Sequence, residues 1–404
     1  MTMTINNEHK KLNVPNLRFP EFQGEWEEYK LEDITAEIGD GIHATPIYDD
    51  NGTFYFVNGN NISEYGITIT ATTQKVTAEE ALRNNASALN SYSILLSING
   101  TIGNVALYKN EPIMLGKSAC YINVSSNINR NYIFYYLMMP KCQFYFTSEL
   151  TGTTIKNLSL KSVRKTKVLL PNANEQSKIA RLFDAINERI ATQNKIIEDL
   201  KKLKCAIIEK HYRQAKLHKY KICDLGVPFS VGSLSKEDLS EEGYECILYG
   251  ELFTTYGCVI NEVKSHTNKI ANTTLSQKGD LLFPSSTTVD AVSLISPSVI
   301  DIPNVILGGD MFGIHIDKKF NAYYLSYYIN LIARKKLAIY AKGSTIIHLH
   351  YKDIAKAQLL LPDLCEQDKN AKCMMAEDAK IKVEEQLLTI LEKQKQYLLR
   401  QMFI

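Results

Sequence analysis

The sequence predicts an α+β protein built as an internal duplication: two tandem α+β domains, each followed by a long helix. One observation is the stretch 169–211, where Leu-Leu-Pro leads into apolar residues at alternating steps of four and three, the pattern of a helix with a heptad seam. A second is that the chain repeats itself at a constant offset. A third is that short apolar runs between Gly and Asn turns precede both helices, which favours mixed α+β domains over regular βαβ units.

The duplication rests on separate matches that share an offset of 191 residues. Leu-Leu-Pro at 169–171 corresponds to Leu-Leu-Pro at 360–362, and Glu-Gln at 175–176 corresponds to Glu-Gln at 366–367. The further matches are 29–34 with 220–225, Gly152-Thr153-Thr154-Ile155 with Gly343-Ser344-Thr345-Ile346, Leu158 with Leu349, and Tyr132 with Tyr323. Chance does not readily place so many matches at one offset.

The first copy begins with a lead-in at 1–25, and the first domain follows at 26–170. Its expected strands and its Tyr-rich buried helix are Thr53–Val57, Ser93–Ile98, Asn104–Tyr108 and Asn131–Met139. The first long helix occupies 171–216, with Asn172 or Asn174 as its N-cap. Its seam consists of Ile179, Phe183, Ile186, Ile190, Ile197 and Leu200. About 40 residues rising 1.5 Å each make a rod of roughly 60 Å, a length that suits a spacer.

The second copy has its domain at 217–361 and its long helix at 362–404. The expected strands and helix are Gly279–Phe283, Val292–Ile295, Gly313–Ile316 and Tyr323–Ile332. Asn370 and Glu377 stand where the first helix has Ile179 and Ile186, so the opening turns of the second helix are expected to fray or bend. The seam resumes at Ile381, Leu388, Leu391 and Leu398.

Composition is that of an ordinary globular protein, with 45% hydrophobic and 22% charged residues. The net charge is +2, but residues 151–220 hold 12 Lys and 4 Arg against 6 acidic residues. That excess predicts either a solvated helix face or a surface for a polyanion. The eight scattered cysteines, without zinc-site spacing, indicate reduced thiols in a cytoplasmic protein. Neither a signal peptide nor a membrane span is predicted.

No catalytic constellation and no metal site are predicted. Gly116-Lys117-Ser118 ends like a phosphate-binding loop, but Glu111 occupies the place of its first glycine. Pro362-Asp363 and Asp378-Ala379-Lys380 form a nuclease-like string whose second half lies on a predicted helix. The chain also lacks a Pro-Pro dipeptide and a G-x-G-x-x-G loop, and its histidines are dispersed.

Loops that recur in both copies are the candidate functional residues. A glycine followed by hydroxyl side chains, as at 152–154 and 343–345, can approach a phosphate closely and donate hydrogen bonds, although a simple turn before a strand has the same composition. A second pair of loops lies at 97–103 and 284–288. The candidate nucleic-acid contacts are His43, Thr45, Asn99, Thr101, Thr153, Thr154, Lys156, Ser285, Thr287, Thr288, Ser344, Thr345 and His348.

With these motifs in place, the whole chain resembles the specificity subunit of a type I restriction-modification enzyme. The resemblance is carried by 17–34, by the junction LLPNANEQSKIARLFDAINERI at 169–190, and by LLLPDLCEQ at 359–367. It implies two target recognition domains, each reading half of a split double-stranded DNA sequence, held apart by two long helices that form an antiparallel coiled coil. It also implies docking of two modification subunits, which carry S-adenosylmethionine, and of restriction subunits, which use ATP and Mg²⁺. The chain itself is then a non-catalytic subunit without a cofactor.

A physical argument supports the same function. Two unequal copies of a polar, loop-rich surface suit an asymmetric bipartite DNA target, because each copy presents different side chains to base edges. The alternative is a two-domain coiled-coil interaction scaffold without DNA specificity. Acidic or apolar faces on the paired loops, or a lack of DNA binding in low salt, would favour that alternative.

Overall fold

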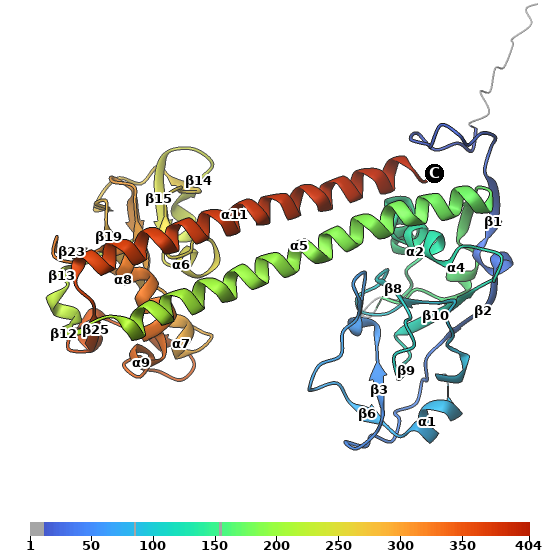
Figure 1. Ribbon diagram of the computed structural model, residues 1–404, viewed down its shortest axis with the longest axis horizontal. Helices are drawn as coiled ribbons and strands as arrows, with labels where there is room; N and C mark the ends of the chain where they lie inside the picture. The colour runs from blue at the N-terminus through green and yellow to red at the C-terminus, as the bar shows by residue number, and fades with distance from the viewer. Residues whose placement is uncertain (1–11, 85, 153–155) are drawn as a thin grey trace, which may run out of the picture. The chain divides into compact units, whose positions relative to one another are not determined.

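The computed structural model describes residues 12–84, 86–152 and 156–404, and the chain divides into two compact units (Figure 1). Unit 1 consists of residues 1–194 and 386–404, and unit 2 consists of residues 195–385. Two long helices, α5 (Ala173–Gln214) and α11 (Leu364–Gln401), each contribute one end to each unit. Each unit therefore combines one α+β domain with parts of both helices.

The domain of unit 1 contains two sheets and two ribbons. An antiparallel sheet has the order β2 (Thr35–Asp40), β10 (Ala119–Val124), β7 (Ser93–Ser97) and β8 (Val105–Leu107). A second sheet has the order β6 (Lys75–Val76), β3 (Phe54–Val57) and β9 (Ile113–Leu115), with β3 and β9 parallel. The ribbons pair β1 (Glu27–Lys30) with β11 (Lys167–Leu170) and β4 (Ile62–Ser63) with β5 (Gly66–Ile67). The helices are α1 (Ala78–Arg83), α2 (Arg130–Met138), α3 (Pro140–Ser148) and α4 (Leu160–Arg164).

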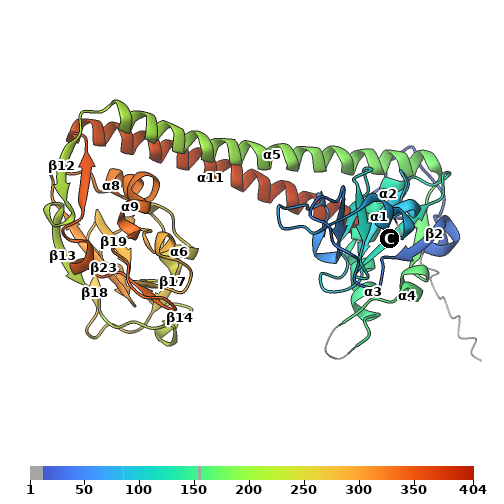
Figure 2. The ribbon, with the colours of Figure 1, turned by 90° about the horizontal axis from the view of Figure 1, so that it is seen from below.

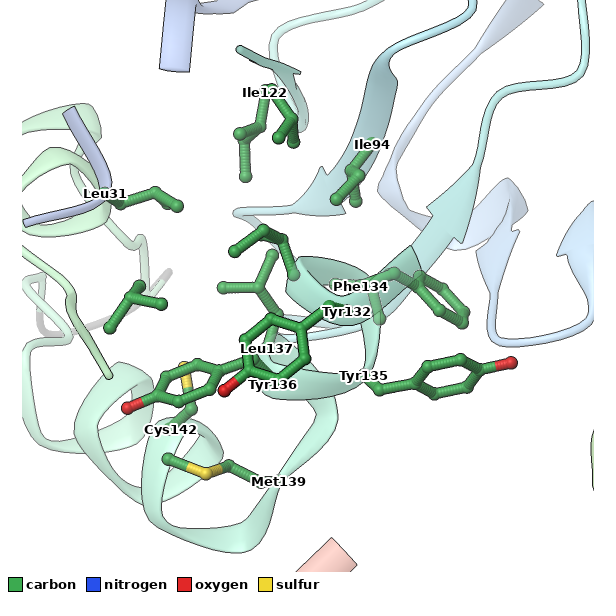
Figure 3. Close-up of a cluster of buried hydrophobic side chains, with 14 of the residues drawn as sticks. Leu31, Ile94, Ile122, Tyr132, Phe134, Tyr135, Tyr136, Leu137, Met139 and Cys142 are labelled. Atoms are coloured by element: carbon green, nitrogen blue, oxygen red, sulfur yellow. The ribbon is translucent and has the colours of Figure 1, made fainter. Parts of the chain in front are cut away.

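The core of this domain forms where α2 covers the four-stranded sheet. Tyr132, Tyr136 and Leu137 of α2 belong to one buried cluster with strand residues such as Ile94 and Ile122 (Figure 3). The predicted strands at 53–57, 93–98 and 104–108 and the predicted helix at 131–139 are confirmed as β3, β7, β8 and α2.

The domain of unit 2 repeats this plan with more strands. One sheet has the order β13 (Gly226–Ser230), β23 (Met311–Ile316), β19 (Asp280–Pro284), β21 (Ser298–Ile300) and β16 (Val259–Ile260). The other has the order β14 (Leu239–Ser240), β17 (Ser265–Thr267), β15 (Tyr244–Leu248), β22 (Ile306–Gly308) and β18 (Thr274–Leu275). The ribbons pair β12 (His218–Lys221) with β25 (Gln358–Leu361) and β20 (Ser286–Thr287) with β24 (Ile347–His348). The helices are α6 (Glu251–Thr254), α7 (Ala291–Leu294), α8 (Ala322–Tyr328), α9 (Arg334–Ala338) and α10 (Tyr351–Ile354), and a π-helical turn at 329–333 joins α8 to α9.

Within unit 2, α8 lies between the long helices and the sheet that contains β19 and β23 (Figure 2). The predicted strands at 279–283 and 313–316 are confirmed as β19 and β23. The strand predicted at Val292–Ile295 is wrong, because this segment forms α7. Asp290 accepts a hydrogen bond from the Ser293 N–H and caps that single turn, and four apolar residues are too few for their period to distinguish helix from strand.

The duplication extends to the strand order. β1, β11 and the start of α5 correspond to β12, β25 and the start of α11 at an offset of 191. The order β2-β10-β7-β8 recurs as β13-β23-β19-β21, and the parallel pair β3-β9 recurs as β15-β22. The match of Tyr132 with Tyr323 is wrong by one residue. Asn129 accepts from the Tyr132 N–H, and Asn321 accepts in the same way from Tyr324, so the local offset is 192.

The Pro and Gln that recur in both junctions join each long helix to its domain. In unit 1 the buried Gln176 donates from Nε2 to the Pro171 carbonyl at 2.8 Å and accepts from the Asn129 N–H at 3.1 Å. In unit 2 Gln367 makes the same two bonds, to Pro362 and Asn321, at 2.8 and 2.9 Å. Each amide thereby satisfies backbone groups of two elements at once.

The caps of the two helices are equivalent. Asn172 accepts from the Glu175 N–H at 3.0 Å, which selects Asn172 over Asn174 as the cap of α5. Asp363 accepts from the Glu366 N–H at the same distance and caps α11.

In each unit the two helices run antiparallel. In unit 1 the end of α11 lies on the start of α5, with the rings of Phe403 and Phe183 centred 5.6 Å apart. In unit 2 the start of α11 lies on the end of α5, where Lys204 Nζ is 2.5 Å from Asp378 Oδ1. The lead-in joins unit 1, because the Leu17 N–H donates to the Gln401 carbonyl at 2.9 Å.

The expectation that α11 frays at its start is wrong, because the helix is unbroken from Leu364. Ala371 and Met374 are buried within unit 2, and the polar Asn370 hydrogen bonds to His211 of α5. Asn370, a polar residue at a seam position, therefore has its hydrogen-bond partner on the other long helix. Glu377 differs, since its buried Oε2 has no hydrogen-bond partner among the described residues.

All eight cysteines are free thiols. None of the described helices has the length and apolar character needed to cross a membrane.

Candidate nucleic-acid interface

In unit 2 the two predicted loops form one ribbon. Ser286 and Thr287 of β20 pair with His348 and Ile347 of β24. The loop at 343–347 is closed by two backbone hydrogen bonds: Lys342 N–H to the His348 carbonyl at 2.9 Å and His348 N–H to the Lys342 carbonyl at 2.7 Å. Gly343 has φ +116°, a conformation that glycine adopts without strain.

Unit 1 builds the equivalent arrangement from a different sequence. Thr151 and Asn157, which precede Lys342 and His348 by 191 residues, exchange backbone hydrogen bonds at 3.0 and 2.9 Å. Asn99 of the other loop forms a β-bridge to Asn157. In both units the next N–H also joins the two loops, with Leu158 donating to Ile98 at 2.9 Å and Leu349 donating to Ser285 at 2.8 Å. The structure thus brings the two predicted loops side by side in both domains.

The candidate contacts of the first domain differ in availability. Thr101 and Lys156 are exposed, and Asn99 is half-buried. The Thr101 hydroxyl donates to the Gly59 carbonyl at 2.8 Å, so it braces the loop as well as facing solvent. Thr153 and Thr154 lie outside the described residues.

His43 and Thr45 follow β2 and are exposed. His43 Nε2 lies 2.9 Å from Asp40 Oδ2. Among the described residues of the first domain, neither takes part in the backbone hydrogen bonds that join the two loops.

In the second domain Thr288, Ser344, Thr345 and His348 are exposed, whereas Ser285 is only 3% exposed. A side chain buried to that degree supports the loop rather than the surface. The half-buried Thr287 accepts from the Val289 N–H at 3.2 Å and so shapes the tip of the ribbon.

Charged groups anchor the ribbon of unit 2. Lys342 Nζ is 2.5 Å from Asp353 Oδ1, and this hydrogen bond lowers the pKa of the Asp353 carboxyl. Hydrogen bonds from the Ser293 N–H and hydroxyl likewise lower the pKa of Asp290, which caps α7 directly after the ribbon.

The predictions missed a pocket of about 660 Å³ beside this ribbon. Side chains outside the candidate set help to line it: Phe253, Thr254, Val289, Arg334 and Ile346. A signal was present in the sequence, because aliphatic residues directly follow the hydroxyl residues of both loops at 288–289 and 345–346. Only the tertiary structure shows that both aliphatic residues line one pocket.

The basic excess of 151–220 is partly neutralised by ion pairs. Lys167, Lys178, Lys201, Lys202, Lys204 and Arg213 pair with acidic side chains. Most of these pairs are exposed, where an ion pair contributes little stability. For these six residues a solvated surface explains the charge. The other ten basic residues of this range include Lys156, which lies in the loop at 152–157.

The two motifs that resembled catalytic sequences, at 116–118 and at 362–380, have structural roles. Ser118 donates to Asn58 and accepts from the Gly59 N–H, both at 2.9 Å. Asp363 caps α11, and Asp378 accepts from Lys204 and from the Tyr327 hydroxyl. In the described parts of the chain, no three His, Cys, Asp or Glu residues are grouped so that they could hold a metal ion.

Comparison with known proteins identifies the class of domain. The family model of the type I restriction modification DNA specificity domain matches residues 23–202 and again residues 216–393. A chain of Methanocaldococcus jannaschii that bears the name of a type I restriction enzyme specificity subunit is 24% identical over 418 residues, which cover 96% of this chain and 95% of the relative.

Two solved structures share the fold. The S subunit of a type I restriction-modification system from M. genitalium matches with a TM-score of 0.60 at 16% identity, over 97% of this chain and 99% of that chain. A chain from a study of complex assembly and conformational transition in a type I system matches with a TM-score of 0.56 at 14% identity, over 94% and 97%.

Because the family model matches most of the chain in two consecutive copies, the protein belongs to the family of type I restriction-modification DNA specificity domains. It is a DNA sequence-recognition subunit, and subunits of this kind are not catalytic. The predicted family and fold class, two tandem α+β domains with long helices, are confirmed.

Proposed function

We propose that the chain reads an asymmetric bipartite DNA target, with the domain at 26–170 reading one half-site and the domain at 217–361 reading the other. One observation carries this proposal: both domains hold two loops side by side through equivalent backbone hydrogen bonds, yet the loop sequences differ. An equivalent scaffold with different side chains presents different hydrogen-bonding groups to base edges.

The loops divide into residues that position DNA and residues that read it. The glycine-led loops at 152–157 and 343–348 offer hydroxyls and Lys156 to phosphate oxygens. Thr153 and Thr154 belong to this group on sequence grounds alone. In this proposal Thr288 and His348, which line the pocket of the second domain, contact base edges.

The same proposal assigns the partners. Two modification subunits dock on the domains and on the helix pair, and restriction subunits join them. The seam residues Ile179, Phe183, Ile186, Ile190, Ile197, Leu200, Ile381, Leu388, Leu391 and Leu398 hold the helix pair together for this docking. S-adenosylmethionine, ATP and Mg²⁺ bind to the partner subunits, this chain carries no cofactor, and the complex works in the cytoplasm, where its DNA substrate is.

A domain exchange tests the proposal. Residues 30–160 are replaced with the equivalent part of a relative that has a different target, and methylated adenines are mapped genome-wide in cells that also express the modification subunits. One half-site is expected to change and the other to remain. The reciprocal exchange of 221–352 is the matched control and should change only the other half. A hybrid whose two half-sites change together would show that the domains do not read separately.

The interaction-scaffold alternative makes the opposite prediction. A scaffold, combined with the modification subunits, would leave DNA unbound in low salt.

A further inference from the structure

The tip of the β20-β24 ribbon carries two exposed aliphatic side chains. Val289 is 73% exposed and Ile346 is 50% exposed, and both line the pocket of about 660 Å³. They come together because the ribbon is antiparallel: Thr287 pairs with Ile347, so the chain leaving Thr287 and the chain approaching Ile347 lie at the same end.

This tip is held in place by hydrogen bonds. The Thr287 hydroxyl accepts from the Val289 N–H at 3.2 Å. Arg334, also in the pocket lining, donates from Nε to the Val292 carbonyl at 2.7 Å and from Nη2 to the Ser293 carbonyl at 3.2 Å, which ties α9 to the segment after the tip. The two aliphatic groups are thus presented on an anchored loop.

The surroundings of the two side chains include groups of the kind that contact nucleic acid. The pocket combines hydroxyl groups of Thr254, Thr287 and Thr288 with the Arg334 guanidinium and the His348 ring. Hydroxyl and basic groups are those that contact phosphates and base edges.

The shape of the element also suits DNA. The major groove of B-DNA, about 12 Å wide, admits a two-stranded β-ribbon. Among the base edges in that groove, only thymine presents an aliphatic group, its 5-methyl, and apolar side chains contact it.

We propose that Val289 and Ile346 contact thymine 5-methyl groups in the major groove, so that the half-site read by residues 217–361 contains at least one A·T pair recognised through its methyl group. This inference rests on the proposed function. It goes beyond that function by naming a base and two specificity-determining residues that the candidate set lacks.

The test uses the full chain with its modification subunits and a duplex that carries the mapped target. Each thymine of the half-site is replaced in turn with deoxyuridine, which pairs identically but lacks the methyl group. At one or two positions the affinity is expected to fall about fourfold, the equivalent of about 0.8 kcal/mol for one buried methyl-sized group. In Val289→Ala or Ile346→Ala, the fall at the contacted position should shrink to less than about 1.5-fold, because the contact is already lost.

Matched controls separate this effect from general damage. Val227→Ala and Ile270→Ala remove the same atoms from side chains that are 67% and 62% exposed in the same domain and do not line the pocket. Both should keep the full response to deoxyuridine. Replacing thymines of the other half-site with deoxyuridine should change the affinity of the parent and of Val289→Ala equally.

Two results would overturn the inference: a half-site indifferent to every deoxyuridine, or a response unchanged in both ribbon variants. A complex that binds no DNA at all refutes the proposed function instead, so the two failures can be told apart.

Discussion

Phe403, the penultimate residue, should be essential to the stability of unit 1. Its ring is 4% exposed and lies 5.3 Å from Tyr132, 5.8 Å from Tyr136 and 5.6 Å from Phe183, measured between centroids. Replacing a buried Phe with Ala costs about 3–5 kcal/mol through lost transfer energy and the remaining cavity. For a unit of roughly 200 residues each kcal/mol lowers the midpoint of thermal unfolding by about 2–4 °C, so Phe403→Ala should lower it by about 10 °C.

The assay follows from the composition, because Trp26 is the only tryptophan. It is 2% exposed and packs edge-on against Tyr132 at 6.2 Å, so its fluorescence reports the unfolding of unit 1. Tyr397→Ala on the same helix is the control. Its side chain is 59% exposed, and a change within about 0.5 kcal/mol is expected. If both variants shift the midpoint equally, the end of α11 does not complete this core and the reasoning fails.

Three further predictions concern the junction, the loop and the helix. Gln176→Leu leaves the buried Pro171 carbonyl and the half-buried Asn129 N–H without their partner, which should cost about 1–3 kcal/mol for the buried group. Trp26 fluorescence should show a lower midpoint of unfolding, and an unchanged midpoint would mean that these bonds are dispensable. Lys156→Gln should reduce the slope of log affinity against log salt concentration by about 0.9. If the slopes of the variant and the parent are equal, Lys156 does not contact a phosphate. Four residues inserted after Asn194 lengthen α5 by about 6 Å. Because a base pair rises about 3.4 Å, methylation mapping should find a spacer between the two half-sites that is longer by one or two base pairs. An active variant with the original spacer would show that the length of α5 does not set the spacer length.

Structural features that depend on residues close together in the chain could be predicted from the sequence. The heptad run from Ile179 to Leu200 predicted α5, and the repeated Pro and Glu-Gln residues predicted the same junction twice. An Asn cap at 172 or 174 was also predicted from local sequence, and the structure selected Asn172. By contrast, the strand expected at Val292–Ile295 failed because the period of four residues is ambiguous, and the cap from Asp290 decided for a helix.

The expected fraying of α11 failed for a different reason. Asn370 and Glu377 interrupt the apolar heptad pattern of their own helix. That pattern does not show which groups a second helix brings next to them. His211 of α5 satisfies Asn370, and burial of Ala371 and Met374 stabilises the same turns. Tertiary packing, which supplies most helical stability in proteins, overrode the local signal.

The sequence by itself determined that the chain is duplicated, that each copy ends in a long helix, and that loops with glycine and hydroxyl residues recur at equivalent positions. These features follow from periodicity and composition, which depend on residues close together in the chain. Only the tertiary structure decided that Gln176 bridges Pro171 to Asn129, that Phe403 completes the core around Tyr132, and that Val289 and Ile346 meet at one ribbon tip. Each of these arrangements brings together residues far apart in sequence, and a side chain carries no local sign of the distant group against which folding will place it.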